Sequence, residues 1–333
     1  MDNITHSLTG ALTAKFIESR STAPEEKVVL RRTFFWLFVV AANLPDIDVF
    51  FSIGRDQFAM IRQHRGITHS ILFAPVLALL PALAFKFLGK VKNLRLLWLI
   101  SLLGIFLHIF FDLATSFGTR VLLPVSEVRY ALDWLFIIDP FFTFLMAAFL
   151  LAGRWVPRRR ALVTSSGIAA VVLYVLIVAF NQTMAAIRVQ EAARKEGVTW
   201  SKISTLPQPL SLFRWQGLIQ TDDAVLQTYF SLFDDDSPRF RIYTQHQDSF
   251  VEKAEKEGSL HSFLGFARHP WVQSFDEDGM HIVEFRDLMF SIDESLTRAF
   301  GFDEQFTPFM LRYTYDTEGK LVEVTFDGEA IER

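Results

Sequence analysis

Histidine and aspartate interrupt the apolar stretches of residues 1–180 at a few positions whose spacing suits metal binding. His108 and Asp112 stand four residues apart within one hydrophobic run, which places both on the same face of a helix. Imidazole and carboxylate together suit zinc, manganese, iron or cobalt. The chain has no cysteine, so a metal site must be built from His, Asp, Glu or backbone oxygen.

Two further motifs supply the same residue types. Asp46 and Asp48 lie in the sequence Asn-Leu-Pro-Asp-Ile-Asp, where the proline disfavours a continuing helix, so both carboxylates are expected at a broken helix end. His64 and His69 enclose the sequence Arg-Gly-Ile-Thr, in which the glycine allows a tight turn. His6 lies near the start of the chain. All are candidates for metal chemistry.

Ionised groups within a membrane cost free energy, so aspartates in the apolar runs require a compensating interaction. Each ionised side chain in a span costs about 2.5 to 3.5 kcal/mol on the insertion scale, so Asp46, Asp48 and Asp112 together cost roughly 8 to 10 kcal/mol. This cost is comparable with the ~5 to 15 kcal/mol net stability of a whole fold. A divalent cation offsets such a cost, since structural zinc sites contribute ~10 kcal/mol or more.

The segments that must position these residues are predominantly apolar. Of 333 residues, 51% are hydrophobic and 21% are charged, and the mean hydropathy is +0.26, which is typical of a membrane protein. A helix crosses a ~30 Å hydrocarbon core with roughly 20 residues. Apolar runs of suitable length predict five spans, at residues 33–51, 70–89, 96–117, 132–152 and 161–180. The segment Ile4–Ile17 is compatible with a surface helix, a re-entrant piece or a sixth span.

The connecting loops differ in charge. Thirteen Lys and Arg fall in residues 15–32, 86–95 and 154–160, against five in the loops on the other side. The richer side is expected to be cytoplasmic, which predicts a multi-pass protein of the cell inner membrane. The three His/Asp motifs then reach the outer face. His6 joins them only if Ile4–Ile17 crosses the membrane.

Residues 181–333 have a different character. Only 11 of the 37 Asp and Glu lie in residues 1–180, against 18 of the 33 Lys and Arg, so the remainder of the chain is acidic. Short alternating runs at residues 239–244, 281–285 and 321–326 predict strands. No basic stripe interleaved with aromatics is present, so no nucleic-acid partner is expected. The sequence does not identify a protein partner for this part.

The sequence therefore predicts an α-helical integral membrane bundle of about five to six transmembrane helices, followed by a small α+β, strand-rich soluble domain. The expected domains are a transmembrane metal-site domain over residues 1–180, a helical neck over residues 181–200 and an extracytoplasmic domain over residues 201–333. The C-terminal histidines have irregular spacing and are interpreted as ordinary surface or packing residues; they are His246, His261, His269 and His281.

Polar residues beside the three motifs are candidates for supporting roles. Asp133 and Asp139 are interpreted as further ligands, as acceptors that orient an imidazole, or as carboxylates at a helix start. Arg65, Arg120 and Arg129 could bind an anionic group such as phosphate. Interfacial anchoring by extended arginine side chains is the alternative for each of the three.

Five motifs, taken in order, resemble the YdjM-like family of predicted membrane-bound metal-dependent hydrolases. They are Thr5-His6-Ser7, Leu44-Pro45-Asp46-Ile47-Asp48, His64-Arg65-Gly66-Ile67-Thr68-His69-Ser70, His108-x-x-x-Asp112 followed by Thr115 and Gly118, and Asp133-Trp-Leu-Phe-Ile-Ile-Asp139-Pro140. The resemblance covers roughly residues 1–145 and implies an integral membrane protein with a divalent-metal site. More distantly, the order of His and Asp is similar to the zinc phospholipase C and P1 nuclease group, whose clustered zinc ions cleave phosphoesters.

That distant similarity implies that His69, His108 and Asp112 bind one metal ion and that His6 and Asp48 bind a neighbouring one. The chain lacks a clear His pair after Asp112, which leaves a third ion without its ligands.

On this interpretation Asp46 and His64 are candidates for the catalytic acid and base or for groups that orient the ligands. The predicted function is hydrolysis of a lipid or lipid-linked phosphoester through two-metal activation of water, with zinc favoured over manganese, iron or cobalt.

Two other functions use the same residues. A metal or proton transporter would use the cluster as a relay, but the inner halves of the predicted spans carry almost no ionisable residues. In a non-catalytic membrane protein, His108 would pair with Asp112, and Asp46 or Asp48 with Arg65. Such pairing would account for one buried His–Asp pair, but it does not account for five separated motifs that are expected at the same face of the membrane.

Overall fold

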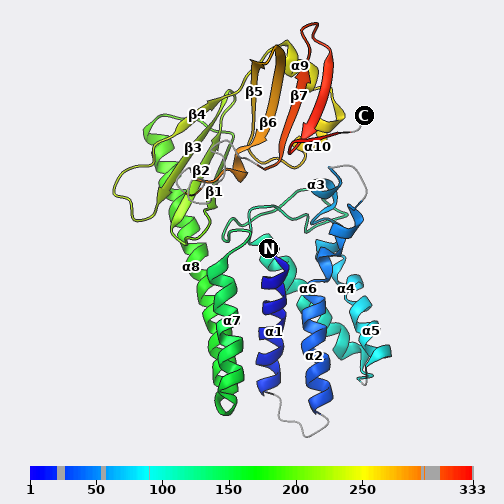
Figure 1. Cartoon of the computed structure of the whole chain (residues 1–333). Coiled ribbons are helices and arrows are strands. Elements are labelled where there is room, and N and C mark those ends of the chain that lie inside the picture. Colours follow the sequence, from blue (N-terminus) through cyan, green and yellow to red (C-terminus); the bar gives the residue numbers. More distant parts are fainter. Residues whose placement is uncertain (21–26, 54–57, 90, 294–295, 297–307, 332–333) are drawn as a thin grey trace. The chain divides into compact units, whose positions relative to one another are not determined.

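The computed structural model describes residues 1–20, 27–53, 58–89, 91–293, 296 and 308–331. The chain divides into two compact units (Figure 1). One comprises residues Met1–Phe51 and His64–Phe180, and the other comprises residues Ser52–Gln63 and Asn181–Arg333. The first is helical and the second is rich in strands, which agrees with the fold class predicted at this level.

The first unit contains most of the helices. They are α1 (Asn3–Arg20), α2 (Lys27–Ala41), the 3₁₀ helices η1 (Leu44–Phe51) and η2 (Ile67–His69), α4 (Ala74–Leu77), α5 (Leu79–Leu88), α6 (Leu94–Leu113), α7 (Pro140–Trp155), η3 (Pro157–Arg159) and the start of α8 (Arg160–Lys195). Helix α1 packs against α2, α6 and α7 (Figure 1). The candidate metal-binding residues come from η1, η2 and α6, beside the beginning of α1.

Within the described residues, two helical segments are long and apolar enough to cross a membrane: Leu94–Leu113 and Pro157–Lys195. Two bent pairs bring the number to four if each pair is one span; they are Arg31–Ala41 with Leu44–Phe51, and Ala59–His69 with Ala74–Leu88. Helix α7 has only 16 residues. By length and composition, the described residues therefore contain two to four candidate spans, compared with the five to six that the sequence predicted.

Two of the predicted apolar spans correspond to helices that begin or end at different residues than predicted. Only the later part of residues 132–152 is helical, because Asp139 caps α7 by accepting from the backbone N of Phe142 and Pro140 occupies the first turn. Helix α8 continues without a break through the predicted last span and most of the predicted neck, and it ends at Lys195.

Residues 114–139 form an irregular segment held by backbone hydrogen bonds. Thr119 and Tyr130 exchange two of them, at 2.8 and 2.9 Å. Leu132 and Trp134 donate to the carbonyl oxygens of Leu113 and Ala114 at the end of α6. The segment is thereby held next to the α6 turn that carries Asp112.

The second unit contains two antiparallel sheets (Figure 1). The first, in order, is β1 (Lys202–Pro207), β2 (Arg214–Gln220), β3 (Ala224–Ser231) and β4 (Arg241–Thr244). The second is β5 (Pro270–Glu277), β6 (Met280–Asp287), β7 (Met310–Tyr315), β8 (Leu321–Phe326) and β9 (Glu329–Ala330). The shorter helices are α3 (Ala59–Gln63), α9 (Ser249–Ala254), α10 (Gly258–Leu264) and η4 (Leu288–Phe290).

Apolar contacts organise the second unit. Ala185 and Val189 on the last part of α8 pack against Trp215 and Ile219 of β2. Phe58, which precedes α3, lies against Phe326 of β8 with ring centroids 4.8 Å apart. Phe58 therefore packs with the strand-rich part of the chain, which the surrounding sequence did not indicate.

Candidate metal centre

Five His and Asp side chains of three elements converge in the first unit. Asp46 and Asp48 come from η1, His69 ends η2, and His108 and Asp112 lie one turn apart on α6. All five are at most 9% exposed. The turn after α2 and Pro45 end the α-helix before Asp46 and Asp48. The two carboxylates therefore face α6 and do not continue along the direction of α2.

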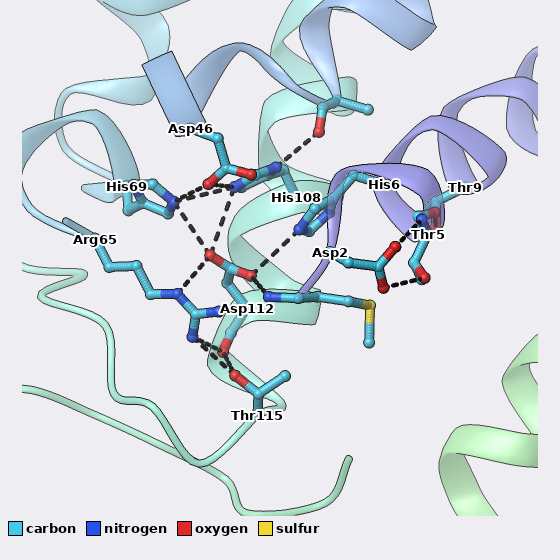
Figure 2. A network of polar contacts seen from close by, with 12 residues as sticks. Asp2, Thr5, His6, Thr9, Asp46, Arg65, His69, His108, Asp112 and Thr115 are labelled. Carbon is cyan, nitrogen blue, oxygen red and sulfur yellow. Dashed lines mark hydrogen bonds and ion pairs between the residues drawn. The ribbon is translucent and has the colours of Figure 1, made fainter. Parts of the chain in front are cut away.

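Four of these side chains enclose a common point (Figure 2). Nε2 of His69 and Nε2 of His108 are 3.0 Å apart, and each lies 3.4 Å from Oδ1 of Asp46. Oδ2 of Asp112 lies 3.1 Å from Nε2 of His69 and 3.5 Å from Nε2 of His108. Ligands of a tetrahedral ion at 2.0–2.1 Å are separated by about 3.3 Å. The four atoms therefore suit a small tetrahedral cation.

The hydrogen bonds on the far side of each ring support this interpretation. Nδ1 of His108 donates to the carbonyl oxygen of Ala42 at 2.7 Å, so its Nε2 presents a lone pair to the cluster. Nδ1 of His69 donates to the Thr68 hydroxyl at 3.0 Å, because that hydroxyl gives its own proton to Asp48, and Nδ1 also lies 3.3 Å from Oδ2 of Asp48. This likewise leaves Nε2 of His69 as an acceptor. Two nitrogen lone pairs and two carboxylate oxygens then face one another in a buried space. A cation between them would relieve this repulsion.

A second group of candidate ligands shares Asp46 with the first. It consists of Asp46, Asp48 and His64, whose ligand atoms lie within 4.8 Å of one another. Nδ1 of His64 is 2.9 Å from Oδ1 of Asp48, and the side chain of His64 is 13% exposed. Oδ2 of Asp48 accepts from the Thr68 hydroxyl and from the backbone N of Arg65. The Asp46 carboxylate therefore belongs to both groups of candidate ligands.

Arg65 connects the two groups. Its Nε lies 2.9 Å from Oδ2 of Asp112, and its Nη1 donates to the carbonyl oxygen of Asp112 and to the hydroxyl of Thr115 (Figure 2). The side chain is 3% exposed and the backbone has φ +56°, a conformation that non-glycine residues rarely adopt. Arg65 thus holds the Asp112 carboxylate in position.

His6 lies beside the first group but outside both sets of ligand atoms that meet the 4.8 Å distance. Its ring stacks on His108, with centroids 3.8 Å apart, and its Nε2 is 3.3 Å from Oδ1 of Asp112. The amino group of Met1 contacts the same oxygen. The structure brings His6 to Asp112 and His108, whereas the distant similarity associated it with Asp48.

The remaining predicted site residues lie at the border of the centre. Asp139 caps α7 and accepts from the Tyr174 hydroxyl at 2.8 Å. Asp133 is buried with φ +56° in the segment that follows α6. Neither belongs to a group of candidate ligands among the described residues. Arg120 and Arg129 lie in the same irregular segment, next to the backbone of Arg65 and His64.

Several supporting contacts are absent from the sequence prediction. The carbonyl of Ala42 and the hydroxyls of Thr68 and Thr115 each fix a candidate ligand or Arg65. Thr68 and Thr115 belong to the quoted motifs, so their proximity in sequence to His69 and Asp112 was a usable signal. A backbone carbonyl carries no such signal.

The four C-terminal histidines lie in the second unit. His281 lies between Ser274 and Asp276, with both contacts at 2.7 Å, and His269 is buried against the Ser204 hydroxyl. Burial, together with the charges of Lys202 and Arg268, lowers the pKa of His269 to about 3. No cluster of three or more candidate ligands includes any of the four among the described residues.

Comparisons with known proteins identify a relative and a family. Protein YfhP of Bacillus subtilis, described as uncharacterised, is 36% identical over 106 residues, a stretch that covers 31% of this chain and 31% of that protein. No solved structure matches the chain. The YdjM inner membrane protein family matches residues 1–185, which is more than half of the chain. The chain therefore belongs to the YdjM inner membrane protein family.

Proposed function

We propose that the protein is a multi-pass, metal-dependent hydrolase of the inner membrane that cleaves a phosphoester of a lipid or lipid-linked substrate. The observation that carries the proposal is the pair of ligand groups that share Asp46. Two divalent ions held a short distance apart supply Lewis acidity, lower the pKa of water and clamp the oxygens of an in-line displacement. The family and the apolar helices support the membrane setting.

The roles of individual residues follow from their positions. Asp46, His69, His108 and Asp112 would hold one ion, and Asp46, Asp48 and His64 would hold the other. Asp46 and His64, which the sequence indicated as candidates for the catalytic acid and base, are thus proposed as ligands instead. His6 would support the first ion through Asp112 and His108. Zinc suits this set of imidazoles and carboxylates, and manganese, iron and cobalt are the alternatives.

A lipid substrate is supported by the apolar residues beside the ligands. Ile47, Phe50 and Phe51 are 40%, 70% and 54% exposed on η1, the same short helix that buries Asp46 and Asp48. Exposed apolar side chains of this size suit contact with acyl chains. A substrate that moves within the bilayer would thus meet the carboxylates without leaving an apolar surface.

The proposed topology has six membrane crossings, with α1, α7 and the bent pairs counted as spans and both ends of the chain outside. The domains would then be a metal-site bundle up to Phe180, a helical connection and an extracytoplasmic strand-rich domain. Helix α1 has 18 residues, which at 1.5 Å per residue corresponds to about 27 Å.

The test compares hydrolysis with transport on the same preparation. Purified protein in a nonionic detergent should hydrolyse a generic phosphoester in the presence of zinc or manganese, and a chelator should abolish the activity. Reconstituted liposomes should show no protein-dependent metal uptake. Metal uptake without hydrolysis would contradict the proposal and favour a transporter.

A further inference from the structure

Three cationic side chains surround one carboxylate where α1 ends and α8 begins. The side chain of Glu18 on α1 is 9% exposed, and its Oε2 accepts from Nζ of Lys15 at 2.8 Å. Nε of Arg31 on α2 and Nη1 of Arg160 on α8 each lie 3.7 Å from Oε1 of Glu18. Side chains of three different helices therefore meet at Glu18.

Hydrogen bonds between α1 and α8 hold this cluster in place. The hydroxyls of Ser19 and Thr164 are 3.0 Å apart. Nη2 of Arg20 donates to the Ser165 hydroxyl at 2.6 Å. The end of α1, the beginning of α2 and the turn between α7 and α8 lie at one end of the helical unit (Figure 1). The cluster is therefore fixed by the packing of helices.

The two guanidiniums lie near Glu18 but are not hydrogen-bonded to it. Their distances of 3.7 Å exceed the roughly 2.7 to 2.9 Å of a hydrogen bond between charged groups. Nε of Arg31 is buried and has no hydrogen-bond partner among the described residues, and Nε of Arg160 donates only to the carbonyl oxygen of Gly153, at 3.4 Å. The side chains of Arg31 and Arg160 are 40% and 34% exposed, so a ligand can reach both.

The cluster has an excess of positive charge. Lys15, Arg31 and Arg160 exceed the single carboxylate of Glu18 by two charges. Arg20, two residues after Glu18, adds a further positive charge in the last turn of α1. An anion placed between the guanidiniums would therefore be attracted by the cluster, and Glu18 alone does not balance it.

Exposed apolar side chains flank the cluster. Ile17, which precedes Glu18, is 40% exposed, and Leu162, two residues after Arg160, is 62% exposed. Trp155 at the end of α7 is 76% exposed, and tryptophan is enriched at the boundary between membrane and water. A ligand with both a charged group and acyl chains therefore suits this end of the bundle better than a small soluble anion.

We propose that Lys15, Arg31 and Arg160 bind the phosphate of an anionic phospholipid, whose acyl chains lie along the exposed apolar residues of α1, α7 and α8. Guanidinium groups present forks of donors that match phosphate oxygens. Basic pockets between helices on the cytoplasmic side are typical sites for anionic headgroups, and this end of the bundle faces the cytoplasm in the proposed topology. The candidate metal centre lies beside the opposite end of α1, so the two sites are separate.

Native mass spectrometry of the full chain tests this site. The protein in a mild nonionic detergent receives equal amounts of phosphatidylglycerol and phosphatidylethanolamine with identical acyl chains. Both lipids have a phosphate, but phosphatidylethanolamine also has an ammonium group, which the cluster would repel. The wild type should retain phosphatidylglycerol preferentially, and the ratio of the two bound lipids should fall about 5-fold in Arg31→Gln and in Arg160→Gln. Equal retention of the two lipids by the wild type would overturn the inference.

Arg95→Gln is the matched control. It removes the same charge from an exposed position in the first turn of α6, outside the cluster, and should keep the wild-type ratio. The ratio is taken within one spectrum, so it does not depend on the folded fraction of a variant. An equal fall in Arg95→Gln and Arg160→Gln would indicate unspecific attraction by surface charge and would contradict the site.

Glycerol 3-phosphate separates a lipid from a soluble phosphate ester. Because it has no acyl chains, it should leave phosphatidylglycerol bound even at concentrations far above that of the lipid. Displacement of the lipid at equal concentration would identify a soluble phosphate as the ligand and would refute the lipid site. Neither measurement involves hydrolysis, so failure of the proposed hydrolase would leave this inference standing.

Discussion

His108 and His69 are each fixed through the ring nitrogen that faces away from the cluster. For His108 the partner is the carbonyl of Ala42, and for His69 the partners are the hydroxyl of Thr68 and the side chain of Asp48, which Thr68 holds in turn. Such outer partners set the tautomer and the direction of the lone pair that a metal would use. The candidate site therefore also depends on Ala42 and Thr68, which would never touch an ion.

Substitution of Thr68 tests whether metal binding depends on such outer hydrogen bonds. Its Oγ1 donates to Oδ2 of Asp48 at 2.9 Å and lies 3.0 Å from Nδ1 of His69. Thr68→Val removes the hydroxyl at similar volume and should weaken zinc binding about 10- to 100-fold, whereas Thr68→Ser should retain most of the affinity. Competition with a chromogenic chelator measures the change. Equal affinities for the valine and serine variants would show that the hydroxyl does not orient the ligands.

Residue types and spacing predicted that His108 and Asp112 share a helix face and that the separated motifs carry candidate ligands. They could not predict that Asp46 belongs to both groups or that His6 stacks on His108. Both facts depend on how η1 and α1 pack against α6, and this packing is not encoded in the local pattern of either motif. The metal-binding roles themselves remain predictions.

At the scale of elements, two glycines allow the helices of the first unit to approach closely. A Cβ on Gly10 of α1 would lie 2.8 Å from the carbonyl oxygen of Phe38, and one on Gly104 of α6 would lie 2.8 Å from Cβ of Ala41. Small residues at such contacts are common where helices pack in membranes. Gly104 lies one turn before His108, so its contact brings α6 to the end of α2 that presents the Ala42 carbonyl.

Gly104→Ala should therefore destabilise the protein and reduce its metal content. We expect a loss of about 1 to 3 kcal/mol, the usual cost of an overpacked contact. Unfolding in mixed detergent with increasing sodium dodecyl sulfate measures the change. Gly258→Ala is the matched control, since nothing lies within 4 Å of a Cβ there. If the two alanine variants are equally stable, the close approach at Gly104 has no structural role.

Sequence patterns predicted the type and approximate position of the helices and strands better than the residues at which they begin and end. The strands predicted near residues 239–244, 281–285 and 321–326 correspond to β4, β6 and β8. The beginning of α7 was missed because Asp139 and Pro140 lie inside an apolar run, where cap and proline outweigh hydropathy. The continuity of α8 was missed because its composition changes from apolar to polar without a helix-breaking residue.

At the scale of the whole molecule, the proposed topology is testable because the chain has no native cysteine. Asn3→Cys and Asp235→Cys place a thiol at exposed positions near the start of α1 and in the strand-rich unit, and Arg158→Cys places one in the basic loop before α8. An impermeant thiol reagent should label the first two from outside and the third only after the membrane is opened. Labelling of Asn3→Cys only from the cytoplasm would exclude the proposed crossing of α1.

The strand-rich unit should have a measurable acid sensitivity at His269. A histidine in the unfolded chain takes up a proton below about pH 6.5, whereas the buried His269 stays neutral until about pH 3. The unfolded state therefore binds more protons in this range, and stability falls as the pH drops from about 6.5 toward 3. His269→Gln should make this loss shallower by about 1.4 kcal/mol per pH unit.

Denaturant unfolding of the full chain between pH 6 and pH 4, followed by tryptophan fluorescence, measures that slope. Trp215 and Trp271 lie in the strand-rich unit. The exposed His261→Gln is the control and should leave the slope unchanged. If His269→Gln has the wild-type slope, burial does not suppress the protonation of this ring.

The most direct test of the central claim is metal analysis of the purified protein. The wild type should carry near-stoichiometric divalent metal, whereas His108→Ala and Asp112→Ala should each lose it, because either change removes one of four converging ligand atoms. His261→Ala, on the strand-rich unit, should retain the metal. The same trace amount of metal in the wild type and in all three variants would contradict the account.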